Sequence, residues 1–112
     1  MVEHNEEKLS VLLKAVSDAT RRALLTQLCQ QGASRVTDIA MHYQMSLNAI
    51  SKHIKVLEKA GLVNRRMHGR VHWIEANLDQ TELMSEWLGS LQSIWTLRLQ
   101  KLDQLLQQGE KT

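Results

Sequence analysis

The chain has 112 residues, of which 43% are hydrophobic and 23% charged, and a formal net charge of +2. This composition excludes a disordered chain, and the length suits one domain that buries roughly two thirds of its surface around a single core. One cysteine excludes an intramolecular disulfide, the polar first residues are unlike a signal peptide, and no apolar run approaches the roughly 18 residues of a membrane span, so we expect a cytoplasmic protein.

Two amphipathic helices are predicted in the first third of the chain. Residues 6–16 carry a stripe at helical spacing, formed by Leu9, Leu12, Leu13 and Val16. Asp18 is the predicted N-cap of the second helix, because its carboxylate can accept from free N–H groups of the first turn, and Gly32 is its predicted end. The apolar face of the second helix is expected to hold Ala23, Leu24, Leu28 and Cys29.

A short helix and a longer one are predicted next. The short helix is expected over residues 36–43, with Thr37 as its cap and with inward residues Ile39, Ala40 and Tyr43. A tight turn, "QMS", leads to a helix that Ser46 caps and that ends at Gly61. Its inward stripe is Ile50, Ile54 and Leu57, which leaves outside Leu47, Asn48, Ser51, Lys52 and Lys55.

The pattern then changes from helical to alternating. Two short runs in residues 62–76 flank the glycine-containing turn "MHGR", which predicts a β-hairpin. Val63 is expected on one side, and Ile74 on the side opposite Trp73. The alternation is imperfect, so the register of the hairpin stays open.

The last helix is predicted over residues 81–108 and is unusually apolar. One seam has heptad spacing, formed by Leu88, Trp95 and Leu102, and a second contains Met84, Leu91 and Leu105, interrupted by Arg98. One small domain cannot cover so much apolar surface, so the excess is expected to pack on another subunit. Trp87 and Trp95 are interpreted as dimer-core residues rather than as a ligand cage.

The charge is unevenly distributed. Residues 46–73 contain six Lys or Arg and one acidic residue, whereas the rest of the chain contains eight and eleven. A basic helix taken alone is as typical of an ordinary solvated surface as of a DNA-binding one. The helix before it and the hairpin after it favour a surface that binds double-stranded DNA.

The basic block contains the predicted DNA contacts. Candidates for base edges lie near the start of the longer helix, namely Asn48, Ser51 and Lys52. Candidates for phosphates are Ser46, His53 and Lys55, although His53 is equally well explained as a half-buried packing residue. Candidates on the hairpin are Arg65, Arg66, His68 and Arg70, and the alternative is a basic tip that only keeps the hairpin soluble.

Two stretches carry a specific resemblance to a known family. "AVSDATRRALLTQL" and "VTDIAMHYQMSLNAISKHIKVLEKAGLVNRRMHGRVHWIEA" resemble the second helix, the reading head and the wing of ArsR/SmtB-type repressors, and the closing helix resembles a metal-free branch. The resemblance implies a mainly α, five-helix winged helix-turn-helix in one domain (1–112), with the helix-turn-helix at 36–60, the wing at 62–76 and a dimerisation helix at 81–108. It also implies dimerisation through the first and last helices, here through Leu9, Leu12, Leu13, Leu88, Leu91, Trp95 and Leu102.

Two residues depart from the family pattern. Gln44 stands where the turn usually has glycine, so it either adopts a left-handed conformation or alters the turn. Leu47 stands where a polar base reader is common, and it is expected to contact a thymine methyl group instead.

Other chemistries find little support. The predicted third and last helices offer no convergent set of metal ligands, and His68 and His72 lie on a hairpin, so we expect no metal and no cofactor. Cys29 lacks a second cysteine and is at most a redox switch. No catalytic constellation is present, so we expect no enzyme. The basic block and the resemblance together predict a homodimeric regulator that represses an inverted-repeat operator. The alternatives are a protein-interaction module and a non-specific architectural DNA binder.

Overall fold

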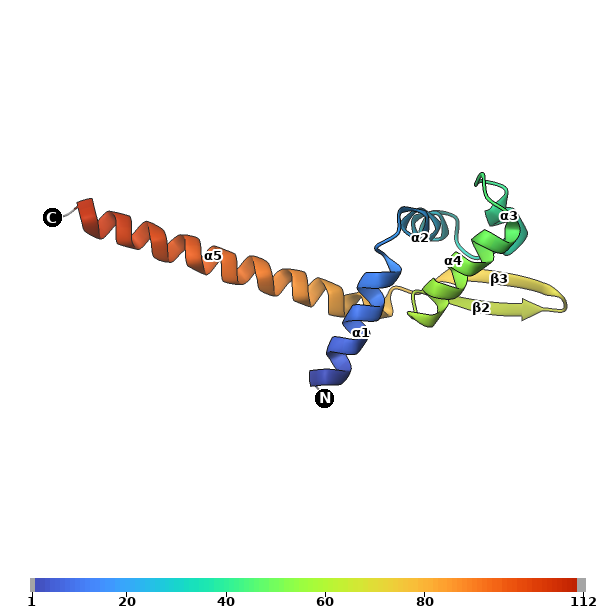
Figure 1. Cartoon of the computed structure of the whole chain (residues 1–112), viewed down its shortest axis with the longest axis horizontal. Coiled ribbons are helices and arrows are strands. Elements are labelled where there is room, and N and C mark those ends of the chain that lie inside the picture. The colour runs from blue at the N-terminus through green and yellow to red at the C-terminus, as the bar shows by residue number, and fades with distance from the viewer. Residues whose placement is uncertain (1, 111–112) are drawn as a thin grey trace.

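The computed structural model describes the backbone of residues 2–110 and the side chains of residues 5–109. Within this part, five α-helices and a small sheet form the mainly helical fold that the sequence predicts (Figure 1). The elements in chain order are α1 (Val2–Ala15), α2 (Ala19–Gln31), β1 (Ser34–Arg35), α3 (Val36–Ala40), α4 (Leu47–Lys59), β2 (Val63–His68), β3 (Val71–Ala76), a 3-10 turn (Asp79–Thr81) and α5 (Glu82–Glu110).

The core lies where α1, α2, α3 and α4 meet the sheet. It is built from aliphatic side chains and alanines, namely Leu12, Ala15, Leu24, Leu28, Ile39, Ile50, Ile54, Leu57, Ala60, Leu62, Val63 and Ile74. The inward stripe predicted for α4 is confirmed, because Ile50, Ile54 and Leu57 are fully buried. We call residues 19–76 the head, since they contribute all but two of these residues.

The hairpin is confirmed, and the structure settles its register. Strands β2 and β3 are antiparallel, with Arg65 opposite Ile74 and His68 opposite Val71. The two residues between the strands begin with Gly69 at φ 63°, which suits the tight hairpin loops that need glycine at the first central position. The short strand β1 was not predicted, and it pairs with the other edge of β3 in the order β1-β3-β2.

Three expectations for α2 and α3 are wrong. Ala23 and Cys29 are exposed, because the narrow inward stripe of α2 consists of Leu24 and Leu28 and both other residues flank it on the solvent side. Thr37 does not cap α3, because the helix begins at Val36 and Thr37 is already its second residue; Arg35 is at the N-cap position and makes no side-chain cap.

The connection between α3 and α4 is longer than the tight turn that was expected. The α-helix α3 already ends at Ala40, and residues 41–46 lead to α4. Among the described residues only glycines have positive φ, so Gln44 does not take the left-handed conformation. Of the two possibilities for Gln44, the altered turn is the one adopted.

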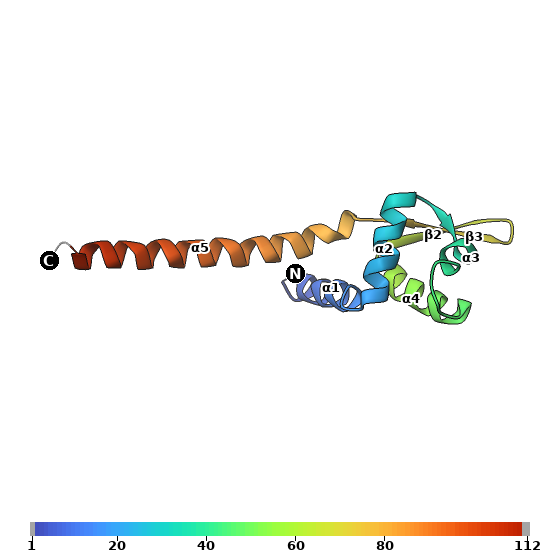
Figure 2. The ribbon, with the colours of Figure 1, turned by 90° about the horizontal axis from the view of Figure 1, so that it is seen from above.

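Helix α5 gives the chain an elongated shape of 76 × 34 × 21 Å. The helix projects from the head on the side where α1 lies, and the hairpin tip lies at the opposite end of the molecule (Figures 1 and 2). Leu83 and Met84 pack against the core, whereas every residue from 90 to 109 is exposed. No helix in the described part of the chain is both long and apolar enough to cross a membrane.

Candidate nucleic-acid interface

Helix α4 has one buried face and one exposed polar face. Its start is fixed by the predicted cap, since Ser46 Oγ accepts a hydrogen bond of 3.1 Å from the backbone N–H of Ala49. Burial of Ile50 and Ile54 turns the opposite face outward. The exposed residues on that face are Leu47, Asn48, Lys52 and Lys55.

His53 lies on the flank of α4 that faces α2. Its Nδ1 accepts from Arg21 Nη1 at 3.3 Å and lies 3.8 Å from Asp18 Oδ2. Arg21 also donates to the carbonyl oxygens of Ala15 at 2.6 Å and Lys14 at 3.0 Å. The ring is half-buried in this cluster, as the packing interpretation of His53 requires.

Asp18 is confirmed as the N-cap of α2. Its Oδ2 accepts from the backbone N–H of Arg21 at 3.0 Å. This hydrogen bond is the main reason why the pKa of Asp18 is lowered, and the charge of Arg21 acts in the same direction against partial desolvation. The end of α1, the start of α2 and the flank of α4 are thus tied together.

The hairpin arginines divide between the two faces of the sheet. Arg65 lies on the face that meets α4, where its Nε is 3.4 Å from Glu58 Oε2 and its Nη1 donates to His72 Nδ1 at 3.2 Å. Arg66, the next residue, points to the other face and pairs with Glu75. Arg65 therefore connects the wing to the C-terminal half of α4, and Arg66 does not share that surface.

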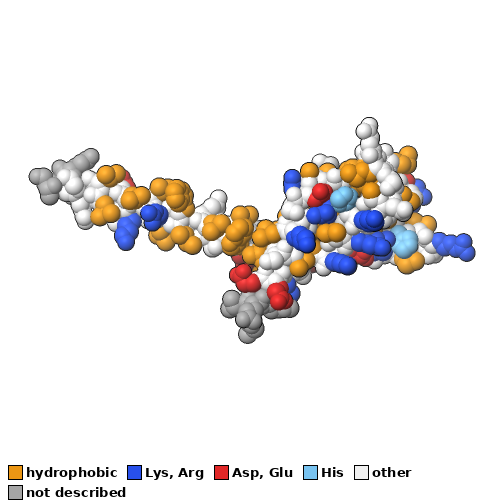
Figure 3. Space-filling model, viewed as in Figure 1, with side chains coloured by type: hydrophobic (Ala, Val, Ile, Leu, Met, Phe, Trp, Pro, Cys, Tyr) orange, Lys and Arg blue, Asp and Glu red, His pale blue; other side chains and the backbone are white. Residues whose placement is uncertain are grey.

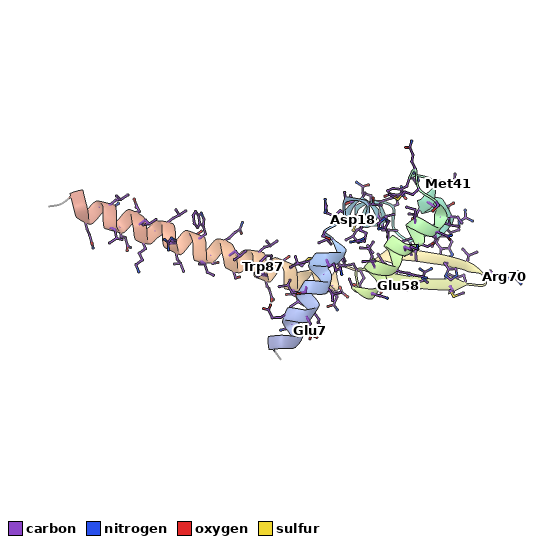
Figure 4. The ribbon with its side chains drawn as sticks, in the orientation of Figure 1. Glu7, Asp18, Met41, Glu58, Arg70 and Trp87 are labelled. Atoms are coloured by element: carbon purple, nitrogen blue, oxygen red, sulfur yellow. The ribbon has the colours of Figure 1, made fainter. Side chains whose placement is uncertain are left out.

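Arg70 lies at the tip of the hairpin and extends away from the core (Figure 4). His68, which ends β2, is exposed as well. Within the described part of the chain, neither side chain has a hydrogen-bond or ion-pair partner. Both are therefore available to an external anion.

A groove of about 390 Å³ separates α4 from the hairpin, and we call it the α4–wing groove. Three segments line it: the start of α3, the exposed side of α4 and the hairpin. The lining residues are Arg35, Val36, Thr37, Leu47, Ser51, Arg65, Arg70, Val71 and His72.

Arg35 and Thr37 were missed as surface residues of this groove by sequence reasoning. Arg35 ends β1, which pairs with β3, and it lines the groove at the point where the chain turns into α3. The Arg35 guanidinium makes a two-pronged ion pair with Asp38, through Nε at 2.8 Å and Nη2 at 3.2 Å, which raises its pKa. No local sequence pattern announces a two-residue strand, so the pairing had no signal in the sequence.

Positive side chains gather over α4 and the hairpin on one face of the molecule (Figure 3). The single acidic residue in residues 46–73, Glu58, is the one that pairs with Arg65. Lys52, Lys55 and Arg70 therefore keep their charges uncompensated on this face. A surface of this kind attracts a polyanion.

Helix α5 carries exposed apolar side chains, in contrast to the charged side chains over α4 and the hairpin. The predicted interface residues Leu88, Leu91, Trp95 and Leu102 are exposed, with Trp95 60% accessible. The helix face opposite the heptad seam is polar and contains Glu86, Ser93, Gln100 and Gln107. On α1, Leu9 and Leu13 are half-buried, whereas Leu12 is 2% exposed and belongs to the subunit's own core.

Residues that could bind a metal are dispersed in the described part of the chain. No group of three His, Cys, Asp or Glu side chains lies close enough there to hold an ion. Cys29 is an exposed free thiol on α2.

Comparison with known proteins supports the assignment of the fold. Residues 18–65 match the bacterial regulatory protein, arsR family. The arsenical resistance operon repressor of Staphylococcus aureus is 35% identical over 71 residues, which are 63% of this chain and 67% of that protein. The transcriptional activator HlyU of Vibrio cholerae is 30% identical over 80% of this chain and 82% of its own length.

A solved structure extends the likeness to three dimensions. The crystal structure of an ArsR family transcriptional regulator superposes with a TM-score of 0.76 at 31% identity, over 81% of this chain and 93% of the other. The predicted winged helix-turn-helix fold is confirmed, as is the expectation that the protein is not an enzyme. The chain belongs to the arsR family of bacterial regulatory proteins, which are transcriptional regulators.

Proposed function

We propose that the protein is a cytoplasmic homodimer that binds an inverted-repeat operator and represses transcription. The observation that carries the proposal is that Asn48, Lys52 and Lys55 on α4 and Arg70 on the wing are exposed together on one face. An α-helix fits the major groove of B-DNA, and uncompensated Lys and Arg side chains bind the phosphates beside it.

The residues on this face have different roles. Asn48, Ser51 and Lys52 lie in the first half of α4, where side chains reach base edges, and Leu47 supplies an apolar contact for a thymine methyl group. Lys55 and Arg70 bind phosphates and contribute affinity without sequence preference. Arg66 and His68 are left out because they lie on the other face of the hairpin, where they line one cavity with Trp73 and where Arg66 pairs with Glu75.

Dimerisation is supported by the exposed seam of α5. A seam of Leu88, Trp95 and Leu102 with a polar stripe opposite is typical of helices that pack on one another. A twofold axis presents two copies of α4, which suits half-sites about 34 Å apart or at a multiple of that spacing. A bound dimer at a promoter would exclude polymerase, and the Staphylococcus aureus relative is named as an operon repressor.

Selection of bound duplexes from a random pool tests the proposal, run with and without reductant. We expect a palindromic sequence and binding that weakens steeply as salt is raised. In Asn48→Ala the preference at one position of each half-site should relax, by about 1–3 kcal/mol of discrimination. Binding without an enriched sequence would indicate an architectural binder, and no salt-sensitive binding would indicate an interaction module instead.

A further inference from the structure

The side chain of Arg21 joins α1 to α4. Its Nε donates to the carbonyl oxygen of Ala15 at 2.6 Å and its Nη2 to that of Lys14 at 3.0 Å, both at the end of α1. Its third nitrogen, Nη1, lies 3.3 Å from Nδ1 of His53 on α4. Because a guanidinium group only donates, Nδ1 of His53 is the acceptor. One planar group therefore binds both helices at once.

The surroundings of Arg21 suit a side chain that holds two helices in position. Its backbone is fixed at the start of α2, since its N–H donates to Oδ2 of Asp18 at 3.0 Å. The last carbonyl oxygens of a helix lack partners within the helix, and a cation beside them is favourable. The guanidinium group is rigid and planar, so the two bonds to α1 also fix the direction in which Nη1 meets His53. A displacement of α4 relative to α1 would break that bond.

Away from Arg21, α1 and α4 are partly separated. A cavity of about 360 Å³ lies between α1 and the end of α4, and its lining includes Val11 on α1 and Ala60 directly after α4. Leu12 brings α1 onto the core, but apolar burial is not directional. We therefore expect the direction of α1 relative to α4 to depend on the bonds of Arg21.

The position of α1 matters for DNA because α1 belongs to the proposed dimer interface. The helix contacts α5 and lies on the side of the head from which α5 projects (Figure 2). In a twofold dimer, the placement of α4 relative to α1 in each subunit sets the distance between the two copies of α4. Duplex DNA advances about 3.4 Å and turns by about 35° per base pair, so a fixed distance fits one spacing of half-sites.

We infer that Arg21 is a positioning residue that sets the spacing between the two half-sites, because it fixes α4 to α1 through His53. The inference rests on the proposed function and adds a determinant of specificity that acts through His53 rather than through a base. Loss of the bond should let each α4 shift relative to the dimer core. More than one spacing of half-sites should then be accepted.

Arg21→Lys tests the link on duplexes in which the enriched half-sites are separated by spacers of different length. Lysine keeps the positive charge at the end of α1, but its single ammonium group does not reproduce three bonds in one plane. The unaltered protein should prefer the best spacer over spacers one base pair longer or shorter by at least about tenfold, as misplaced base contacts usually cause, and this ratio should fall below about threefold in Arg21→Lys.

His53→Ala removes the other end of the same link. It leaves the bonds from Arg21 to α1 in place, and it should lower the spacer ratio as Arg21→Lys does. The double variant should lower the ratio no further than either single variant, because the two residues form one link. A His53 that only bound a phosphate would instead weaken binding to every spacer alike.

Arg22→Gln is the matched control. Nη1 of Arg22 donates to the carbonyl oxygen of Val16 at 2.7 Å, just beyond the end of α1, and among the described residues Arg22 has no bond to α4. The substitution should leave the spacer ratio unchanged. The ratio also separates positioning from folding, because a less stable variant loses the same fraction of folded protein on every duplex. Thermal midpoints of all variants report stability separately.

The possible results separate the inference from the proposed function. An unchanged spacer ratio in Arg21→Lys or in His53→Ala would overturn the inference alone, as would an equal change in Arg22→Gln. Equal binding of all spacers by the unaltered protein would also overturn the inference alone. Failure of the unaltered protein to enrich any inverted repeat would overturn the proposed function and the inference together.

Discussion

In the head, large apolar side chains lie inside, whereas along α5 they lie outside. Leu24, Ile54 and Leu57 are fully buried in the head, and Trp95 and Leu102 are exposed on α5. The head thus completes its own core within one subunit, and α5 has apolar surface that the subunit does not cover. We therefore expect the head to determine the fold of the subunit and α5 to form the proposed dimer interface.

Trp95→Asp should break the assembly and leave the head intact. The substitution places a charge in the centre of the proposed seam, where Trp contributes a large contact area. The dissociation constant of the dimer should rise by more than about 100-fold, measured by sedimentation equilibrium. Ser93→Asp, on the polar stripe, is the control and should stay dimeric, whereas a stable native dimer of Trp95→Asp would show that α5 is not the interface.

Leu57→Ala should have the opposite effect: it should destabilise the head and leave the interface on α5 unaltered. Its side chain is fully buried between α4 and the rest of the core. Removing it should lower the free energy of unfolding by about 2–5 kcal/mol, measured by urea denaturation with the dimer state monitored in parallel. The same substitution at exposed Leu106 on α5 should cost the head nothing, and an equal loss there would mean that head and α5 do not differ as described.

The parts of the head that follow from local pattern were predictable from the sequence. Ile50, Ile54 and Leu57 recur at helical spacing, and Ser46 precedes them as a cap, so α4 and its exposed face were found. The hairpin was found because Gly69 interrupts an alternating run. Each of these signals lies within one element, where side-chain period and turn chemistry act over a few residues.

The parts of the site that depend on distant pairing were not predictable. Arg35 lines the α4–wing groove at the junction of β1 and α3, and β1 exists only through its pairing with β3, which is far along the chain. The division of Arg65 and Arg66 between two faces required the hairpin register, which the imperfect alternation left open. Cys29 was predicted on the apolar face of α2 because that face was drawn too wide. The helix buries only Leu24 and Leu28, and Cys29 lies outside this stripe.

Arg70→Ala should weaken DNA binding moderately without changing sequence preference. Arg70 lies at the hairpin tip and, among the described residues, has no partner, so its loss removes phosphate contacts and disturbs no internal bond. The affinity should fall several-fold, roughly 3- to 10-fold, for the selected duplex and for unrelated duplexes alike, as measured by fluorescence anisotropy. A loss confined to the selected sequence would instead identify Arg70 as a base reader.

Asp18→Asn should have the smallest effect, and its size should depend on pH. The hydrogen bond from the backbone N–H of Arg21 lowers the pKa of Asp18 in the folded chain below its ordinary value of 3.8. A carboxyl with a lowered folded pKa stabilises the fold above its unfolded pKa and loses this contribution as the pH falls through the folded pKa.

The thermal midpoint of the unaltered protein should therefore exceed that of Asp18→Asn at pH 7, and the difference should shrink below pH 3.8. The amide keeps the capping geometry, so the variant isolates the charge that faces Arg21 and His53. A difference that persists unchanged to strong acid would mean that packing, and not the charge of Asp18, links α1 and α2 to the flank of α4.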